Sequence, residues 1–443
     1  MKIVIIGGSF AGMSCALEAA KLYPQADIKV IDEQERVGFI PSGLNLKLNS
    51  EIDSLTQAYF LSERDILKAG VHLLAQHRAV AIDVEMQQVE VEDVSGSRKR
   101  LEYDKLILAM GSKQSSALVA ELNDERIVST KQFHYAQVAE DIIERAYHVA
   151  VIGGGQIGIE AAEALVNANK QVSLIEANAT LAARYFDKEF VADIQQAIEL
   201  VGVDLHLGEA VESITTEPLC VSTAGNELYP DAIILGVNLL PNSQLVEGTV
   251  ALNADGTVQV NEYLETSVPN IYAIGDLVQT PYALSGEERF IALVNNAIRS
   301  GQVVAFNLLK PRVKQAKSLR LIGSRVFSQY IVSVGMTEQE ASQQFDVLAV
   351  HQTAPYSLTD VSDVHLKLVV NRESGQLLGA QLRSEQNILG FADALALAIG
   401  QGLTDEQLAF QDRLYYPNET AAYPIMYRAA LDSFARRSEG AAE

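Results

Sequence analysis

The sequence predicts an α/β fold with two Rossmann-like dinucleotide-binding domains, followed by an α+β C-terminal dimerisation domain. Three observations support this prediction. Two stretches, starting at residues 1 and 149, each combine an apolar strand, a glycine-rich turn and a helix. The 443 residues are too many for one ordinary hydrophobic core. Beyond Lys310-Pro311, which marks a linker, strand and helix patterns alternate without another nucleotide motif.

The first glycine turn lies within residues 1–12, which read MKIVIIGGSFAG. The run from Ile3 to Ile6 predicts a strand buried on both faces, and the glycines after it predict a tight turn into a helix. Such a turn leaves backbone N–H groups free to bind a pyrophosphate at the helix N-terminus. Asp32 ends the next strand, 20 residues beyond Gly12, where a carboxylate can bind a ribose hydroxyl.

The second glycine turn, Gly153 to Gly158, is a full GxGxxG between an apolar strand and a helix. Glu176 ends the following strand, 18 residues after Gly158. A carboxylate there accepts a hydrogen bond from a free 2′-hydroxyl and repels a 2′-phosphate, so we expect NADH to be preferred over NADPH. Two dinucleotide sites in one chain indicate hydride transfer from a nicotinamide to a flavin. Residues 266–276 agree, because this strand ends in Gly275-Asp276 and can place a carboxylate beside a flavin's ribityl chain.

The remaining patterns predict ordinary strands and helices. Strands are expected at residues 80–82, 89–91, 103–112, 218–221, 319–334, 364–370 and 377–382, and helices at residues 59–69, 290–297, 337–344, 387–401 and 404–410. The N-terminus of the helix at 290–297 is expected to face the electron-rich end of the flavin and stabilise its reduced anion. The predicted domains are a discontinuous flavin-binding domain (1–112 and 250–315), an NADH-binding domain (113–249) and a dimerisation domain (316–443).

Composition limits the location and the partners. With 34 basic and 57 acidic residues, the formal charge of −23 argues against binding nucleic acid or an anionic membrane surface. No stretch approaches a membrane span, and no leader is apparent, so we expect a soluble, cytoplasmic protein. Cys15 and Cys220 are interpreted as small core residues, and no Cys/His spacing indicates a metal site.

Over nearly its whole length, the chain resembles the pyridine nucleotide-disulfide oxidoreductase family, in particular its NADH oxidase, NADH peroxidase and coenzyme A-disulfide reductase branch. The resemblance rests on GGSFAG at Gly7, GGGQIGIEAAEAL at Gly153, YFDKEF at Tyr185, TSVPNIYAIGD at Thr266 and LGAQL at Leu378. It implies FAD in the N-terminal domain, NADH in the middle domain, and a homodimer in which the C-terminal domain helps to cover the partner's active site.

The resemblance also implies cofactor contacts. FAD contacts are expected at Gly7, Gly8, Ser9, Ala11, Gly12, Asp32, Ser42, Ala109, Met110, Gly111, Asp276 and Ala292, with Lys131 as a looser match. NADH contacts are expected at Gly155, Ile157, Glu176, Tyr185 and Gly323. The predicted set also includes Phe10, Gln156 and Gly275, which lie in the two glycine turns and at the Gly-Asp strand end.

Several residues depart from the family pattern, and two of these departures together indicate a change of mechanism. Ser42 stands where the family carries its redox cysteine, and a hydroxyl cannot store a redox equivalent as a thiol does. Phe10 replaces the histidine of the oxidase and peroxidase members, and Gln156 replaces the tyrosine that shields the flavin. Losing cysteine and histidine together argues against cysteine-based reduction of peroxide or disulfides.

The predicted function is therefore an FAD-dependent NADH oxidoreductase in which the flavin is the only redox centre. Electrons would pass from NADH to FAD and on to oxygen, giving peroxide, with no side chain as a covalent catalyst and no metal. Two alternatives remain open: an NADH dehydrogenase (diaphorase) that serves a quinone, a small carrier or a protein acceptor, and a slow redox sensor that binds FAD and NADH.

Overall fold

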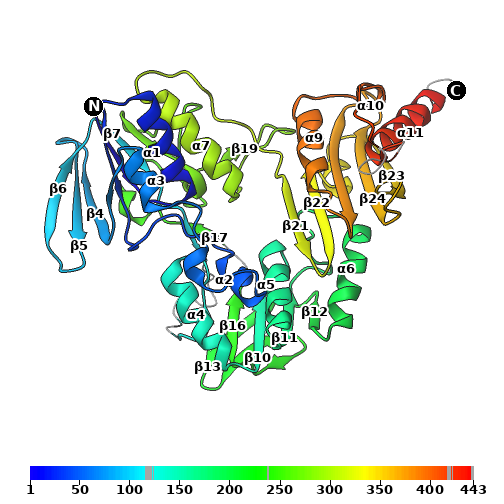
Figure 1. Ribbon diagram of the computed structural model, residues 1–443, viewed down its shortest axis with the longest axis horizontal. Helices are drawn as coiled ribbons and strands as arrows, with labels where there is room; N and C mark the ends of the chain where they lie inside the picture. Colours follow the sequence, from blue (N-terminus) through cyan, green and yellow to red (C-terminus); the bar gives the residue numbers. More distant parts are fainter. Residues whose placement is uncertain (115–121, 123, 237–238, 417–420, 422, 441–443) are drawn as a thin grey trace.

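The computed structural model describes residues 1–114, 122, 124–236, 239–416, 421 and 423–440. Three units, each built round a five-stranded sheet, make up the molecule (Figure 1). The N-terminal unit contains both chain segments that flank the central unit, and the C-terminal unit follows a linker that begins after α7 (Val294–Asn307). This arrangement confirms the predicted fold class.

The N-terminal unit is a parallel sheet with the order β18-β7-β1-β2-β3. Its strands are β1 (Lys2–Ile6), β2 (Asp27–Ile31), β3 (His72–Leu74), β7 (Lys105–Leu108) and β18 (Ile271–Ala273). Helix α1 (Phe10–Leu22) lies along α7, where a Cβ on Gly301 would come within 2.3 Å of the Ala11 carbonyl oxygen. An antiparallel sheet of β4 (His77–Asp83), β5 (Gln88–Asp93) and β6 (Arg98–Glu102) adjoins this unit.

The central unit repeats the parallel arrangement with the order β12-β11-β10-β16-β9. Its elements are β9 (Ile127–Val128), α4 (Phe133–Arg145), β10 (His148–Ile152), α5 (Gln156–Asn167), β11 (Gln171–Glu176), α6 (Lys188–Leu200), β12 (Asp204–Leu207) and β16 (Ala232–Leu235). An antiparallel set of β13 (Val211–Thr216), β14 (Leu219–Thr223) and β15 (Glu227–Leu228) extends it. Strands β8 (Ser112–Gln114) and β17 (Leu239–Pro241) pair where the chain crosses between the first two units.

The C-terminal unit is antiparallel, in the order β21-β22-β25-β24-β23. Its strands are β21 (Ile322–Val326), β22 (Gln329–Gly335), β23 (Val347–Pro355), β24 (Asp363–Asn371) and β25 (Leu377–Ser384), and its helices are α8 (Glu338–Ala341), α9 (Leu389–Gly400), α10 (Asp405–Ala409) and α11 (Ile425–Gly440). The smaller elements of the chain are α2 (Gly43–Leu48), α3 (Glu63–Lys68), β19 (Thr280–Pro281), β20 (Glu288–Arg289) and the 3-10 turns Leu55–Gln57, Gln244–Val246 and Gly275–Leu277.

Several predicted boundaries were wrong. The helix expected at 59–69 begins only at Glu63, because Tyr59 forms a β-bridge with Phe39. The helix expected from residue 290 begins at Val294. The strand expected at 319–334 is a hairpin that turns at Phe327 and Ser328, both with positive φ. Strand β23 and helix α11 were not predicted at all.

Two further observations concern the cysteines and the helices. Cys15 and Cys220 are both buried and unpaired, which confirms that they are small core residues. Among the described residues, no helix is both long enough and apolar enough to cross a bilayer.

Candidate functional site

The two glycine turns share one hydrogen-bond pattern. The Gly8 N–H donates to Asp32 Oδ2 at 2.6 Å, and the Gly154 N–H donates to Glu176 Oε2 at 2.6 Å. In each half, the acid at the end of the second strand therefore holds the turn between the first strand and its helix. Burial raises the pKa of the Asp32 carboxyl, although two backbone N–H groups work against this rise.

Glycine is required where each helix starts. A Cβ on Gly12 would lie 1.9 Å from the Gly7 carbonyl oxygen, and a Cβ on Gly158 would lie 1.8 Å from that of Gly153. Neither α1 nor α5 has a side-chain cap at its N-terminus. The first N–H groups of both helices therefore remain open to an anionic ligand, as a bound pyrophosphate requires.

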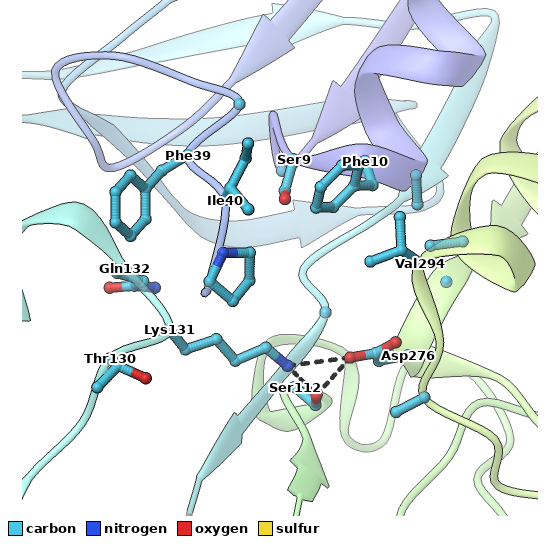
Figure 2. A pocket seen from close by; sticks show the side chains of 18 of the residues that line it. Ser9, Phe10, Phe39, Ile40, Ser112, Thr130, Lys131, Gln132, Asp276 and Val294 are labelled. Atoms are coloured by element: carbon cyan, nitrogen blue, oxygen red, sulfur yellow. Dashed lines mark hydrogen bonds and ion pairs between the residues drawn. The ribbon is translucent and has the colours of Figure 1, made fainter. Parts of the chain in front are cut away.

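A cavity of about 390 Å³ lies between the N-terminal and central units. Ser9, Phe10 and Ile40 line one side of it, and Lys131, Ser112 and Asp276 lie opposite (Figure 2). The N-terminus of α7 also reaches the cavity through Ala292, Leu293 and Val294, and this helix has no side-chain cap either. The positive ends of two helix dipoles thus meet in one hollow, which suits a ligand that carries a phosphate and an electron-rich ring.

A polar cluster crosses the floor of this cavity. The Ser112 hydroxyl donates to Asp276 Oδ2 at 2.6 Å, and the Lys131 ammonium lies 3.0 Å from the same oxygen (Figure 2). Lys131 also donates to the Ser112 hydroxyl. Asp276 follows Gly275, whose φ of +68° permits the sharp turn after β18. The cluster can hold a ligand's hydroxyl groups, because both oxygens of Asp276 are acceptors.

A second hollow of about 860 Å³ adjoins the first and shares Gly7, Asp32, Met110, Ser112 and Lys131 with it. Its outer part is lined by Glu33 after β2 and by Ala79 and Val80 of β4. Asp32 is the residue that the sequence analysis expects to bind a ribose, and this outer part of the hollow lies beyond it. The sequence analysis placed Val80 in a strand but gave neither Ala79 nor Val80 a binding role, and neither residue belongs to a motif that could have revealed one.

The structure brings together most of the predicted FAD residues. The predicted residues that line the first cavity are Gly7, Gly8, Ser9, Phe10, Ala11, Asp32, Ser42, Ala109, Met110, Gly111, Lys131, Ile157, Gly275, Asp276 and Ala292. Those outside its lining are Gly12, Gly155, Gln156, Glu176, Tyr185 and Gly323. Gly12 is a packing position beneath the turn, and Gly155, Gln156 and Glu176 surround the second glycine turn.

No cysteine lines the cavity among the residues that the structure describes. Ser42 lies there just before α2, and Phe10 stacks on Phe60 with their ring centroids 4.2 Å apart. Cys15 is fully buried in the core of the N-terminal unit, and burial raises the pKa of its thiol to about 12. Cys220 is buried in β14 of the central unit.

An aromatic cluster with an arginine forms another part of the wall. The rings of Phe39, Tyr59 and Phe133 lie 5.6 Å apart in every pair, and the Arg36 guanidinium carbon lies 4.1 Å from the Tyr59 ring centroid. Phe39, Phe133 and Arg36 line the cavity. The sequence analysis missed Arg36 and Phe133, because the loop and the helix that carry them meet only in the folded chain.

The second glycine turn contacts the C-terminal unit. Gln156 donates to Glu160 Oε1 at 3.0 Å, and the Ser324 hydroxyl donates to the same oxygen at 2.5 Å. Gly323, a predicted NADH residue, precedes Ser324 on β21 and therefore lies close to the start of α5. Ile157 is 42% exposed and is available to a ligand on this turn.

One group of described side chains has the spacing of a metal site. Ligand atoms of Glu189, Glu338 and His351 lie within 4.8 Å of one another. The Lys367 ammonium already contacts both carboxylates, at 2.5 Å and 2.6 Å. A positive side chain therefore occupies the place that a cation would need.

Comparison with known proteins decides the family. Residues 1–301 match the family described as pyridine nucleotide-disulphide oxidoreductase, and residues 323–424 match the dimerisation domain of that family. The chain belongs to this family. It is therefore an oxidoreductase, and its cofactors are FAD and NADH.

Similar proteins match this oxidoreductase along all or nearly all of its length. The NADH oxidase of Enterococcus faecalis is 28% identical over 429 residues, covering 94% of this chain and 96% of its own. The solved water-forming NADH oxidase of Lactobacillus brevis, bound to NADH, has a TM-score of 0.93 and 28% identity, covering both chains fully. A pyridine nucleotide-disulfide family oxidoreductase from Enterococcus faecalis has a TM-score of 0.89 and 34% identity, covering 99% of this chain and 100% of its own.

Proposed function

We propose that this protein is an FAD-dependent NADH oxidase in which FAD is the only redox centre and oxygen is reduced to peroxide. The balanced reaction is NADH + H⁺ + O₂ → NAD⁺ + H₂O₂. The observation that carries the proposal is that Ser42 and Phe10 both line the cavity, at the two positions where the resemblance implies the family's redox cysteine and its histidine. The similarity to NADH oxidases supports the first half of this reaction, the oxidation of NADH.

The chain's own residues would bind and orient FAD. Its pyrophosphate would lie on the open N–H groups of α1, with the adenosine between Asp32 and the Ala79-Val80 edge of β4. Asp276 would accept hydrogen bonds from the ribityl hydroxyls, and the N-terminus of α7 would stabilise negative charge at the ring. Bound FAD supplies the two-electron chemistry, accepting hydride from NADH and passing electrons to oxygen.

NADH would bind on the second glycine turn. Glu176 would accept a hydrogen bond from the adenosine ribose, and Ile157 would contact the dinucleotide where it crosses the turn. Gly155 and Gln156 lie at the open N-terminus of α5, and Tyr185 and Gly323 complete the proposed NADH contacts. These positions stay predictions of the sequence, as do the domain boundaries 1–112 with 250–315, 113–249 and 316–443.

Peroxide, rather than water, is the expected product because the protein offers no second electron carrier. The resemblance implies that family members use a redox cysteine that cycles between thiolate and sulfenate, and a serine hydroxyl cannot do this, so a water-forming cycle is harder to complete here. Cys15 cannot take the role, because its thiol is fully buried with a pKa of about 12. Cys220 is remote in the fold, on the antiparallel extension of the central unit.

A second candidate function is electron transfer to a quinone or another small carrier. The specific observation that favours it is the aromatic wall of Phe39 and Phe133, beside Ile40 and Pro41. A flat apolar acceptor can stack on such a wall. The third alternative, a slow redox sensor, would leave the flavin reduced in air.

Measuring hydrogen peroxide formed per NADH consumed tests the proposal. One peroxide per NADH is expected, both in the wild type and in the matched variant Cys15→Ala/Cys220→Ala, because neither cysteine takes part. Near-complete conversion of oxygen to water would contradict the proposal. Anaerobic reduction by NADH, followed by a screen of oxygen, quinones and small carriers, separates the oxidase from the two alternatives.

The same proposal includes the oligomeric state of the protein, its location and its partners. We propose a homodimer, supported by the match to the dimerisation domain and by the exposed Phe410, Leu414 and Tyr423 on the C-terminal unit. A cytoplasmic location and the absence of nucleic acid partners stay predictions from the composition.

A further inference from the structure

A fully buried lysine lies where the central and C-terminal units meet. Lys367, on β24, has a side chain that is 1% exposed, and its ammonium contacts three carboxylates. The distances are 2.8 Å to Asp187, 2.5 Å to Glu189 and 2.6 Å to Glu338. Asp187 and Glu189 belong to the start of α6 in the central unit, whereas Glu338 begins α8 in the C-terminal unit. Figure 1 shows α6 next to the C-terminal sheet.

The hydrogen bonds that hold the Asp187 carboxylate come from the C-terminal unit. Its Oδ2 accepts from the Gln381 side chain at 2.6 Å and from the Glu338 N–H at 3.0 Å. Its own N–H donates to Gln381 Oε1 at 2.9 Å. Asp187 occupies the N-cap position of α6 but makes no side-chain cap there, so its carboxylate serves the C-terminal unit instead.

The segment that ends at Asp187 begins at the second glycine turn. The Ala182 N–H donates to the Gly154 carbonyl at 2.8 Å, and a Cβ on Gly154 would meet the Leu181 side chain at 2.5 Å. The Tyr185 N–H donates back to the Ala182 carbonyl at 2.8 Å. At the other end, the Ser333 hydroxyl of β22 donates to the Tyr185 carbonyl at 2.5 Å. Residues 181–187 therefore connect the dinucleotide turn directly to the C-terminal sheet.

The charges in this contact stabilise one another. Burial alone would lower the pKa of the Lys367 ammonium, but its three carboxylate partners raise that pKa above the ordinary value. Separating one partner from such a buried group leaves the other charges uncompensated, so arrangements that break the contact are strongly disfavoured. A segment fixed in this way pays little ordering entropy when a ligand binds to it.

We propose that Lys367 is a positioning residue for NADH. It holds Asp187 from the C-terminal unit, and thereby fixes residues 181–187 in the geometry that places Tyr185 and the Gly154 turn for the dinucleotide. The inference rests on the proposed NADH site at this turn, and it does not depend on which acceptor receives the electrons. It assigns the C-terminal unit a part in cofactor affinity, separate from its part in dimerisation.

The test compares variants of the FAD-loaded enzyme. Lys367→Met is expected to raise the KM for NADH and the Kd for NAD⁺, measured by calorimetry, by roughly five- to tenfold. The kcat at saturating NADH and the FAD content should change less than about twofold, because the residue lies outside the FAD cavity. Ser333→Ala, a milder change, should weaken NAD⁺ binding in the same direction. If Lys367→Met does not fold, Ser333→Ala decides the question by the same criterion.

Arg383→Met is the matched control. Arg383 on β25 pairs with Asp193 of α6, so it joins the same two units without contacting residues 181–187. Its removal should lower thermal stability and leave the affinity for NAD⁺ unchanged. A double-mutant cycle adds a second check: if Lys367 acts through Asp187, then Lys367→Met/Asp187→Asn should bind NAD⁺ as well as Lys367→Met alone.

The outcomes separate this proposal from the proposed function. Unchanged NAD⁺ affinity in both Lys367→Met and Ser333→Ala overturns the positioning role, and so does an equal loss in Arg383→Met. Glu176→Ala tests the site itself. If it leaves NAD⁺ affinity unchanged, the dinucleotide binds elsewhere and both proposals fail; if it weakens binding while Lys367→Met does not, only the positioning role fails.

Discussion

Replacing Glu176 by glutamine tests the expected preference for NADH over NADPH. The Glu176 carboxylate lies at the end of β11 and is held by the N–H groups of Gly154 at 2.6 Å and Asn178 at 2.7 Å. Glutamine keeps the length and one oxygen acceptor but removes the negative charge. Its effect on NADPH and on NADH can therefore be worked out separately.

The expected gain for NADPH is large. Two unit charges about 5 Å apart, at an effective dielectric constant of about 20, repel by about 3 kcal/mol, or roughly a hundredfold in binding. Removing the charge of Glu176 should therefore raise kcat/KM for NADPH by roughly ten- to a hundredfold. For NADH, exchanging a charged hydrogen-bond acceptor for a neutral one costs about 1 kcal/mol, so kcat/KM should fall roughly fivefold.

The assay is anaerobic flavin reduction, followed by absorbance, with each dinucleotide in turn. Glu199→Gln is the control, because it removes one negative charge from the exposed face of α6 without touching the glycine turn. Should Glu176→Gln change both dinucleotides by the same factor, the carboxylate does not select against the 2′-phosphate, and the proposed NADH position would be wrong.

Two more predictions follow from the packing and from the buried charges. Gly12→Ala should lower the free energy of unfolding by about 3 kcal/mol and reduce FAD retention, because its Cβ would lie 1.9 Å from the Gly7 carbonyl oxygen. Gly225→Ala is the control, because a Cβ on Gly225 would meet open space. Equal FAD content and equal unfolding midpoints in the two variants would contradict this prediction. The pKa of Asp187 is lowered in the folded protein, so its stabilisation is present above about pH 4 and is lost as the pH falls through the folded-state pKa. The pKa of Lys367 is raised, so its stabilisation is present below about pH 10.4 and is lost as the pH rises through the folded-state pKa. The stability difference that Lys367→Met causes is measured by denaturant unfolding in a His351→Gln background, because the His351 imidazole lies 3.7 Å from Glu189. In that background the difference should be constant from about pH 5 to 9 and shrink outside that range; a difference that changes near neutral pH would show that other groups control the contact.

The sequence was sufficient to predict the parts of the site that depend on residues close together in the chain. Gly7 to Gly12 and Gly153 to Gly158 each specify a strand, a turn and a helix within a few residues, so both turns were predicted correctly. Asp32 and Glu176 could be placed because a parallel neighbour strand ends beside each turn. These predictions needed no knowledge of distant contacts.

The sequence was insufficient where distant segments meet. The contact of Lys367 with Asp187 joins residues separated by 180 positions, and the aromatic cluster joins Phe39 with Phe133. One signal for Lys367 was available: a single lysine stands within the apolar run VHLKLVV of β24, and such a residue is buried only with partners. Helix α11 was missed because its mixed polar pattern gave no clear apolar stripe.

Anaerobic reductive titration of the FAD-loaded enzyme addresses the number of redox centres most directly. With Ser42 in the cavity and both cysteines buried elsewhere, the flavin should be fully reduced after two electrons per subunit, and no further reductant should be consumed. Uptake of four electrons per subunit would mean that a second carrier exists, and the proposed peroxide-forming reaction would be wrong.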